Sequence, residues 1–213
     1  MSADVRAPLL GEPLPVELMN TVWADRDRVH DALADPAEAL AWLRAAAART
    51  ELPAGDISAP TRAAEAGTLI SDLRDLRDAL RQLAADLTND PRPDRGPGSR
   101  PAADVSRAAA VSTINRVTAA APAWPELSWP DDGPATSQVR TRAPAAQALL
   151  SLIAAQAVSL FTTPGQPPLR ACLGPGCVLY FVQHHPRREW CSAACGNRAR
   201  VARHYRRHHP EAR

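Results

Sequence analysis

The sequence of 213 residues contains no lysine, so all 25 of its basic residues are arginines. It also lacks a long uninterrupted apolar run. A membrane span needs about 20 predominantly apolar residues, whereas polar residues interrupt the most apolar stretch, Ala143–Phe161, at Gln147, Ser151, Gln156 and Ser159. We interpret this stretch as a buried core helix. The N-terminus shows no charged start followed by an apolar run and a cleavage site, and we expect a cytoplasmic protein that does not enter a membrane.

The motifs of the common enzyme classes are missing as well. The chain has no P-loop, no G-x-S-x-G, no dinucleotide-binding fingerprint and no H-E-x-x-H. We therefore do not expect an enzyme. A hydrophobic fraction of 45% excludes wholesale disorder, and the length suits one medium domain followed by a small one.

Charge is distributed unevenly along the chain. Residues 170–213 carry nine arginines and two acids, Glu189 and Glu211, whereas residues 1–169 carry 16 arginines and 21 acids. The two segments therefore have charge balances of +7 and −5. Such an asymmetry indicates a basic module that meets a polyanion.

Several stretches show the capping or the periodicity of helices. Asp35-Pro36-Ala37-Glu38 combines a cap residue, a proline at the first helical position and an acid, and predicts a helix that runs through Ala48. A second helix is expected from about Pro60 to Leu87, where leucines recur at steps of four and three: Leu69, Leu73, Leu76, Leu80, Leu83 and Leu87. Two interpretations of this stripe are open: it packs against the protein's own helices, or it forms a dimeric coiled coil. We favour the first, because the stripe has fewer than three heptads.

Breakers divide the rest of the chain. Residues 88–101 are rich in proline and glycine and predict a loop, and residues 102–120 predict a third helix. Residues 126–142 contain the turn signal Asp131-Asp132-Gly133-Pro134 and predict a short hairpin. Residues 162–168 (TTPGQPP) cannot continue a helix. We therefore expect a mainly α protein with two domains, a mostly helical domain over residues 1–165 and a small module over residues 166–213. The apolar residues expected on the third helix are Val105, Val111, Ile114 and Val117.

The four cysteines are clustered near the C-terminus with the spacing C-x4-C-x13-C-x3-C: Cys172, Cys177, Cys191 and Cys195. Two close pairs are typical of a tetrahedral zinc site. Gly174 and Gly176 favour a tight turn between the first pair, and residues 178–182 (VLYFV) are expected to form a strand. A helix that starts at Ser192 would place the second pair on one face. The arrangement resembles a treble-clef-like ββα finger that holds one structural zinc.

Other uses of these cysteines are disulfides or an iron–sulfur cluster, and a cytosolic setting disfavours disulfides. Four thiolates complete the shell of a zinc ion and leave no position for water or substrate, so we expect a structural metal and not a catalytic one. The metal would stabilise a module too small to fold reliably on its own core. Histidines that could serve as alternative ligands are His184, His185, His204, His208 and His209.

The helix that follows the cysteines presents arginines. At about 100° per residue, Arg200, Arg203 and Arg207 share one face, and Arg206 lies beside them. A solvated helix face is the simpler interpretation, but the absence of interleaved acids favours contact with a polyanion. Arg187 and Arg188 at the preceding turn would add to the charge.

The opposite side of this helix is expected to face the hairpin and the metal, with Val201, Ala202 and Tyr205 turned inward. Arg198 falls on the same inner side. We expect it to donate to carbonyls of the finger or to pair with Glu189, and contact with nucleic acid is the alternative.

The segment Cys191-Ser192-Ala193-Ala194-Cys195-Gly196-Asn197-Arg198, preceded by Arg188 and Trp190, resembles the CGNR zinc finger family of bacteria over about residues 168–210. Leu18-Met19-Asn20-Thr21, the nearby Arg26 and Asp27, and Ala39–Leu43 resemble the ABATE domain over roughly residues 14–160. The resemblance implies a stress-induced transcriptional regulator whose finger binds DNA and whose mostly helical domain senses a signal or dimerises.

The resemblance also singles out residues outside the ligand set. It implies structural roles for Trp190, Gly196, Asn197 and Arg198. It makes Asn20, together with Arg26, a candidate for a ligand pocket. The alternative for Asn20 is a satisfied buried amide or a helix cap.

We therefore expect a zinc-dependent, DNA-binding transcriptional regulator that forms a possible homodimer through its N-terminal domain, with an effector that the sequence does not identify. A protein-interaction adaptor and an RNA-binding protein are the alternatives. Tyr180 and Phe181 would stack on bases in an RNA-binding protein, although they are expected to pack inside the finger.

Overall fold

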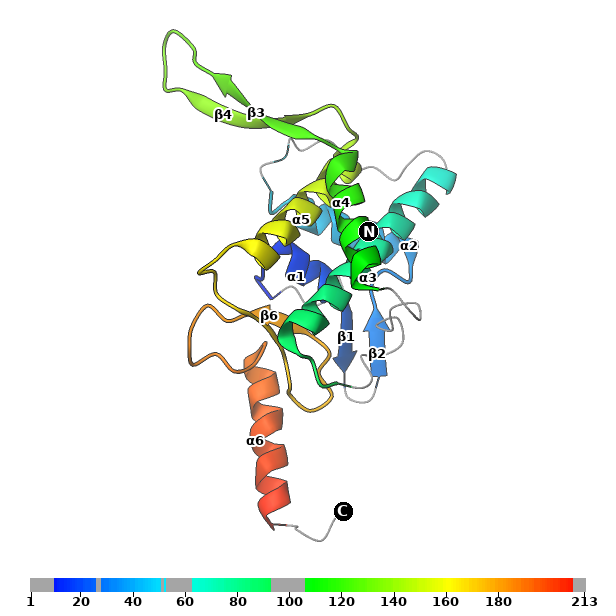
Figure 1. Ribbon diagram of the computed structural model, residues 1–213, viewed down its shortest axis with the longest axis vertical. Helices are drawn as coiled ribbons and strands as arrows, with labels where there is room; N and C mark the ends of the chain where they lie inside the picture. The colour runs from blue at the N-terminus through cyan, green and yellow to red at the C-terminus, as the bar shows by residue number, and fades with distance from the viewer. Residues whose placement is uncertain (1–9, 26–27, 51, 53–62, 93–105, 209–213) are drawn as a thin grey trace.

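The computed structural model describes residues 10–25, 28–50, 52, 63–92 and 106–208, and about half of the chain is helical (Figure 1). The strands form three separate antiparallel pairs. The helices are α1 (Leu14–Met19), α2 (Pro36–Ala47), α3 (Ala63–Thr88), α4 (Arg107–Ala120), α5 (Ala145–Thr162) and α6 (Ala193–His208). The strands are β1 (Val22–Asp25), β2 (Arg28–Asp31), β3 (Ala123–Ser128), β4 (Thr136–Thr141), β5 (Leu169–Ala171) and β6 (Tyr180–Val182).

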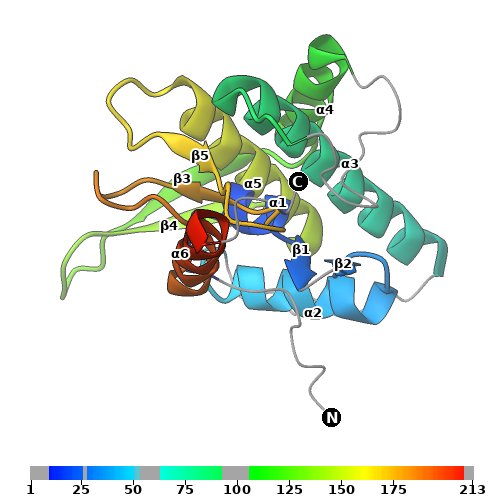
Figure 2. The ribbon, with the colours of Figure 1, turned by 90° about the horizontal axis from the view of Figure 1, so that it is seen from below.

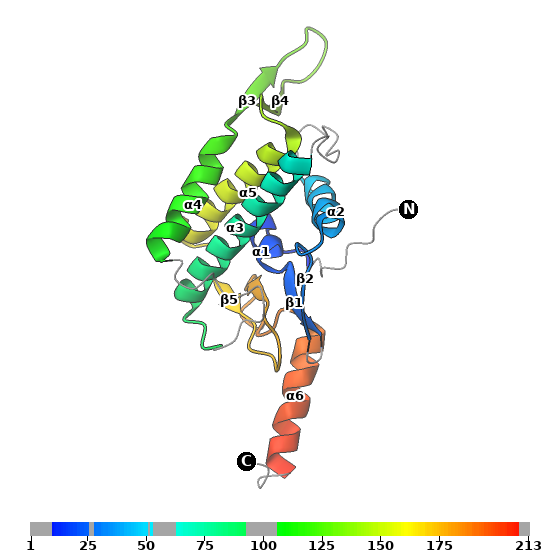
Figure 3. The same cartoon turned by 90° about the vertical axis from the view of Figure 1, so that its right-hand side faces the viewer.

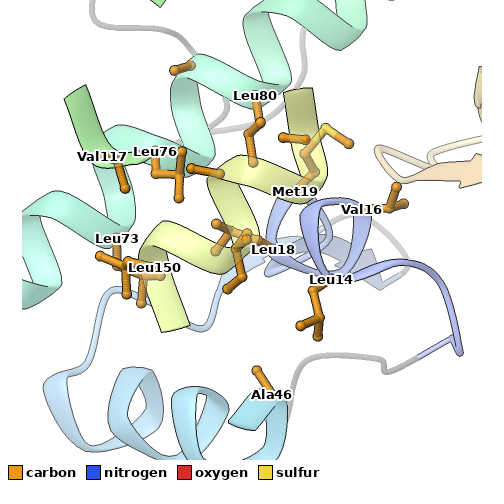
Figure 4. Packing of buried hydrophobic residues seen from close by; sticks show 14 of the residues in the cluster. Leu14, Val16, Leu18, Met19, Ala46, Leu73, Leu76, Leu80, Val117 and Leu150 are labelled. Atoms are coloured by element: carbon orange, nitrogen blue, oxygen red, sulfur yellow. The ribbon is translucent and has the colours of Figure 1, made fainter. Parts of the chain in front are cut away.

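The core lies where α3, α4 and α5 pack side by side and where α1 packs against α3 and α5 (Figures 3 and 4). Leu73, Leu76 and Leu80 of α3 are fully buried there. The leucine stripe therefore packs against the protein's own helices, as we favoured. Leu87 does not belong to the buried stripe, because its side chain, in the last turn of α3, is 54% exposed.

The other helices follow their sequence signals with one correction, at Val111. Asp35 caps α2 by accepting from the amides of Ala37 and Glu38. α4 begins after Ser106, whose hydroxyl accepts from the Ala109 amide, and the expected contribution of Val105 lies outside the described residues. Val111 is exposed, because the buried side of α4 is set by residues spaced four and three apart: Ala110, Ile114 and Val117.

α5 is the helix that we expected in the core, and its inner side is buried against α1, α3 and α4. Among the described residues it is also the one helix long and apolar enough to cross a membrane, by length and composition alone. Its buried side includes Leu149, Leu150, Ile153, Ala154 and Ala157.

The strand pairs are partly predicted. The expected hairpin at residues 126–142 is present, but it is longer and pairs Ala123 with Thr141 at its base. The hairpin of β1 and β2 and the strand β5 have no counterpart among the sequence predictions. The C-terminal elements follow in the order β5, β6 and α6, and the treble-clef assignment stays a prediction.

Candidate metal centre and basic helix

The four cysteine sulfurs converge on one point. They lie within 4.8 Å of one another and all four residues are buried. The Sγ atoms of Cys177 and Cys191 are 3.8 Å apart, and those of Cys191 and Cys195 are 3.4 Å apart. A disulfide bond would bring two sulfurs to about 2.05 Å, whereas a zinc ion with Zn–S bonds of about 2.3 Å separates its four sulfurs by about 3.8 Å. The donor set and its spacing therefore fit one tetrahedral zinc ion.

Two local features build this site. The turn after Cys172 closes with a hydrogen bond of 2.9 Å from the Cys177 amide to the Gly174 carbonyl, and Gly176 adopts a φ of +70° that favours glycine. Gly174 also lies so close to the second pair that a Cβ there would be 3.1 Å from the Cβ of Cys195. Ser192 caps α6, since its hydroxyl accepts from the Cys195 amide at 3.3 Å.

The surroundings favour the thiolate form at two of the four sulfurs, those of Cys172 and Cys195, whereas contact with the Cys172 sulfur above all raises the pKa of Cys177 and of Cys191. Hydrogen bonds from the Cys177 and Cys191 thiols lower the pKa of Cys172 to about 7, and contacts with the other thiols, that of Cys172 above all, also lower the pKa of Cys195. The Arg198 guanidinium donates to the Cys195 sulfur at 3.0 Å. Burial disfavours the charge of Arg198, but the nearby sulfur outweighs burial and raises the pKa of this guanidinium. Arg198 thus faces inward, with Cys195 as its acceptor instead of the expected finger carbonyls or Glu189.

The remaining motif residues also have structural contacts. A Cβ at position 196 would lie 3.1 Å from Cδ1 of Trp190, so Gly196 allows the indole to sit against α6. Asn197 accepts a hydrogen bond from Arg200 on the next turn. Within the described part of the chain, the cysteine cluster is the one group of residues placed to hold a metal. His184, His185, His204 and His208 therefore lie outside the ligand set, and His209 lies outside the described residues.

The finger is fastened to the helical domain through the outer edge of β6. The Asn20 side chain makes two hydrogen bonds of 2.9 Å with Tyr180, donating to its carbonyl and accepting from its amide. Two residues further along the same edge, the Val182 amide donates to the buried carboxylate of Glu12 at 2.9 Å. The two side chains thus take the place of a neighbouring strand.

A second set of contacts comes from the end of α3. The Arg81 guanidinium is buried and donates to the carbonyls of Met19 and Val178, and burial lowers the pKa of Arg81 to about 10. Asp90 pairs with Arg92 at 2.6 Å and accepts from the Tyr180 hydroxyl at 2.8 Å. One nitrogen of Arg92 also lies 3.1–3.4 Å from three carbonyls around the first cysteine pair: those of Cys172, Cys177 and Leu179.

These contacts decide between the two interpretations of Asn20 and confirm the expected packing of Tyr180 and Phe181. Both polar atoms of the Asn20 amide are occupied by the Tyr180 backbone, so Asn20 is a satisfied buried amide and caps α1 instead of lining a ligand pocket. Arg26 lies outside the described residues. Tyr180 and Phe181 are buried and unavailable for stacking on bases.

α6 extends away from the body of the protein and is seen end-on from below (Figures 1 and 2). Its exposed arginines include Arg200, Arg203, Arg206 and Arg207. The expected inward packing of Val201 and Tyr205 is wrong. These side chains are 69% and 56% exposed, because the helix continues past the finger and no element of the described part of the chain lies beside its last turns (Figure 1).

The two arginines of the preceding turn differ. Arg187 is exposed. Arg188 instead donates to the carboxylate of Glu12 at 2.6 Å and to the carbonyls of Val182 and Cys191, and it lies over the Phe181 ring. Its guanidinium is therefore occupied within the fold, and we remove it from the candidate nucleic-acid contacts.

Comparison with known families agrees with this geometry. A family model named ABATE and described as "Putative stress-induced transcription regulator" matches residues 12–164. A model of the CGNR zinc finger matches residues 169–208. No curated protein matches the chain. Together with the clustered sulfurs, the second match confirms the prediction of one structural zinc held by the four cysteines.

Sequence reasoning missed the residues that join the two parts: Glu12, Arg81, Asp90 and Arg92. Their partners are far away in the sequence, and no local pattern distinguishes these four from other charged residues.

Proposed function

Because the chain belongs to the ABATE family and carries a CGNR zinc finger, we propose that it is a zinc-dependent regulator that binds DNA through the arginine face of α6. The observation that carries the proposal is the position of that face. The arginines stand on a helix that leaves the body of the molecule, where a long polyanion can reach them without meeting the rest of the fold (Figures 1 and 3).

The electrostatics of α6 support this role. Arg200, Arg203, Arg206 and Arg207 are exposed, and the printed sequence has no acid between Cys191 and His209. The zinc ion and four thiolates carry a net charge of about −2. The four sulfurs are buried and Arg198 donates to the Cys195 sulfur, so this negative charge lies inside the finger and not on the outer face of α6. Within the described residues none of these four arginines pairs with an acid, so the outer face of α6 presents net positive charge.

The dimensions are compatible with a DNA groove. A helix of 16 residues is about 24 Å long, and the major groove of B-DNA admits an α-helix. Contact with about four phosphates by the four arginines gives a salt dependence with a slope near −3.6 per protomer. Specific recognition needs a second contact surface, and we propose that the helical domain supplies it by dimerisation, or else receives a signal.

An adaptor role is the second candidate, and the exposed apolar residues of the finger favour it. Val201 and Tyr205 lie one turn apart on α6, and Leu173 beside the first cysteine is 54% exposed. A protein partner would bury these side chains. The closed four-thiolate shell leaves no open coordination position, which supports a binding role over catalysis in either case.

The test is a fluorescence anisotropy titration of zinc-loaded full-length protein with duplex DNA across a salt series. The variant Arg203→Gln/Arg207→Gln removes two charges from α6. The matched control Arg107→Gln/Arg116→Gln removes two charges from exposed positions on α4. We expect the α6 variant to reduce the salt slope by about 1.8 per protomer and the control to leave it unchanged.

Equal effects of the two variants would mean that net charge, and not α6, determines binding. Absence of DNA binding by the wild-type protein would reject the proposal, and structured RNA in the same assay tests that alternative polyanion.

A further inference from the structure

Two histidines lie among the arginines of α6. His204 and His208 are four residues apart, so their side chains project from the same side of the helix, one turn from each other. Their rings are in contact, with centres 4.3 Å apart and planes tilted by 40°. Both residues are exposed. The pair is therefore a compact group of two titratable side chains on the surface of α6.

This histidine pair borders the arginine face. At about 100° per residue, His204 projects about 40° from Arg200 and about 60° from Arg207 around the helix axis. The buried residues Cys195 and Ala199 mark the side of α6 that packs against the finger. On the same count the arginines lie between that side and the histidines. A phosphate backbone that contacts Arg200 and Arg207 therefore runs beside the histidine pair.

The charged groups near the pair are positive. Those on α6, together with the one phenol, are Arg200, Arg203, Arg207 and Tyr205. In the described part of the chain no other element lies beside the last turns of α6 (Figures 1 and 3). The sequence has no acid between Cys191 and His209, and Glu211 lies outside the described residues. A polyanion is thus the kind of partner that supplies negative charge to both rings.

We propose that His204 and His208 are further phosphate contacts of the DNA-binding face of α6, and that they act there only when protonated. Histidine is the side chain whose charge ordinarily changes between about pH 5 and pH 8. Phosphate oxygens favour the charged form of a ring that contacts them, so DNA binding and proton uptake are linked, each favouring the other. The inference rests on the proposed function and adds the proton as a regulator of the same site.

The expected sign of this regulation is a tighter complex at lower pH. Four arginine contacts give a salt slope near −3.6 at about pH 8. Each histidine that gains a proton and contacts a phosphate adds about −0.9, so the slope approaches about −5.4 near pH 6. Arginine contacts alone keep one slope over this range, because a guanidinium stays charged throughout.

The experiment is the anisotropy titration of zinc-loaded full-length protein with duplex DNA, with the salt series repeated at about pH 6, pH 7 and pH 8. His204→Gln/His208→Gln removes both titrating rings of the pair. The matched control His184→Gln/His185→Gln removes two exposed histidines from the turn that precedes α6. From pH 8 to pH 6 we expect affinity to rise at least about fivefold in the wild-type protein and in the control, and less than about twofold in the α6 variant.

A second variant makes the charge permanent. His204→Arg/His208→Arg should bind DNA at pH 8 with about the salt slope that the wild-type protein reaches near pH 6. Effects of acid on the metal site are common to all the variants, so the comparison between them isolates the histidine pair.

Three outcomes would overturn the proposal: an unchanged salt slope of the wild-type protein from pH 8 to pH 6, an equal pH dependence in His204→Gln/His208→Gln, or no tighter binding by the arginine variant at pH 8. DNA binding through the arginines persists in each of these cases. Absence of DNA binding at every pH would instead reject the proposed function, and this inference with it.

Discussion

The side-chain amide of Asn20 pairs with both backbone groups of Tyr180, 160 residues further along the chain. Both residues are fully buried, so this pair replaces two hydrogen bonds that β6 would otherwise have made with a neighbouring strand or with water. The helical domain therefore binds the finger by hydrogen bonds to the backbone of β6 as well as by the packing of side chains.

Replacement of Asn20 should therefore destabilise the docked finger. Asn20→Ala leaves the amide and the carbonyl of Tyr180 buried without partners, and each such group costs about 1–3 kcal/mol. We expect a loss of about 2–5 kcal/mol in the free energy of unfolding, measured by urea denaturation.

Asn20→Asp tests the same pair with an isosteric side chain. It keeps one acceptor for the Tyr180 amide but removes the donor to the carbonyl and buries a charge. A stability equal to that of the wild-type protein in both variants would show that the pair contributes nothing to docking.

Removal of zinc should affect the helical core as well as the finger. Leu169, Tyr180 and Val182 of the finger belong to the same apolar cluster as α1 and α3, and each buried side chain of this size contributes about 1.5–3 kcal/mol. Chelation of zinc, or Cys177→Ser, should therefore increase amide hydrogen exchange in α3. Two independent domains would instead leave the exchange rates in α3 unchanged.

Arg92 should act on metal affinity although it touches no sulfur. Its guanidinium holds three carbonyls around the first cysteine pair and is fixed by Asp90. Outer partners of metal ligands commonly change affinity by about 10–100-fold, and we expect Arg92→Leu to weaken zinc binding in that range. Competition with a chromophoric chelator measures the effect, with Arg116→Leu as a control at an exposed position on α4 that pairs with Asp72. An unaltered affinity in Arg92→Leu would contradict the assignment.

Glu17 should give the stability a pH dependence at mildly acidic pH. Burial raises its pKa above the ordinary value of 4.5, against the opposing hydrogen bonds from the Leu10 and Glu12 amides and the charge of Arg49. A carboxyl whose pKa is raised on folding binds protons more tightly in the folded state. Its stabilising contribution is present below pH 4.5 and is lost as the pH rises through the raised value.

The variant Glu17→Gln removes this titration and keeps an acceptor for the two amides. Urea unfolding at a series of pH values from roughly 5 to 8, the range in which protein stability is usually maximal, should show a smaller decline with rising pH for the variant than for the wild-type protein. Parallel curves would show that Glu17 does not titrate differently in the folded and unfolded states.

The metal site could be predicted from the sequence because its ligands and the turns that position them depend on residues close together in the chain. The four cysteines lie in two close pairs, and Gly174 and Ser192 support turns and caps that depend only on neighbouring residues. The helix signals at Asp35 and along the leucines of α3 are local in the same sense, and they predict elements that the structure contains.

The interface between finger and helical domain is not local. Glu12, Arg81 and Arg92 are indistinguishable in sequence from solvated surface charges until the fold brings them to the carbonyls and amides of the finger. The misassigned side of α6 has a related cause. Helical periodicity places Val201 and Tyr205 opposite the arginines, but it does not indicate where the neighbouring elements end.

Asn20 and Glu12 attach β6 to the helical core, and α6 extends from the same finger. The orientation of α6 therefore follows the position of the finger on that core. Since the helix is about 24 Å long, a rotation of roughly 10° at its root displaces its last turn by about 4 Å. This displacement is close to the rise of one base-pair step, about 3.4 Å. In the proposed complex with DNA, a small rearrangement among α1, α3 and the finger would therefore shift the last arginines of α6 by about one base-pair step, while the zinc site itself stays intact.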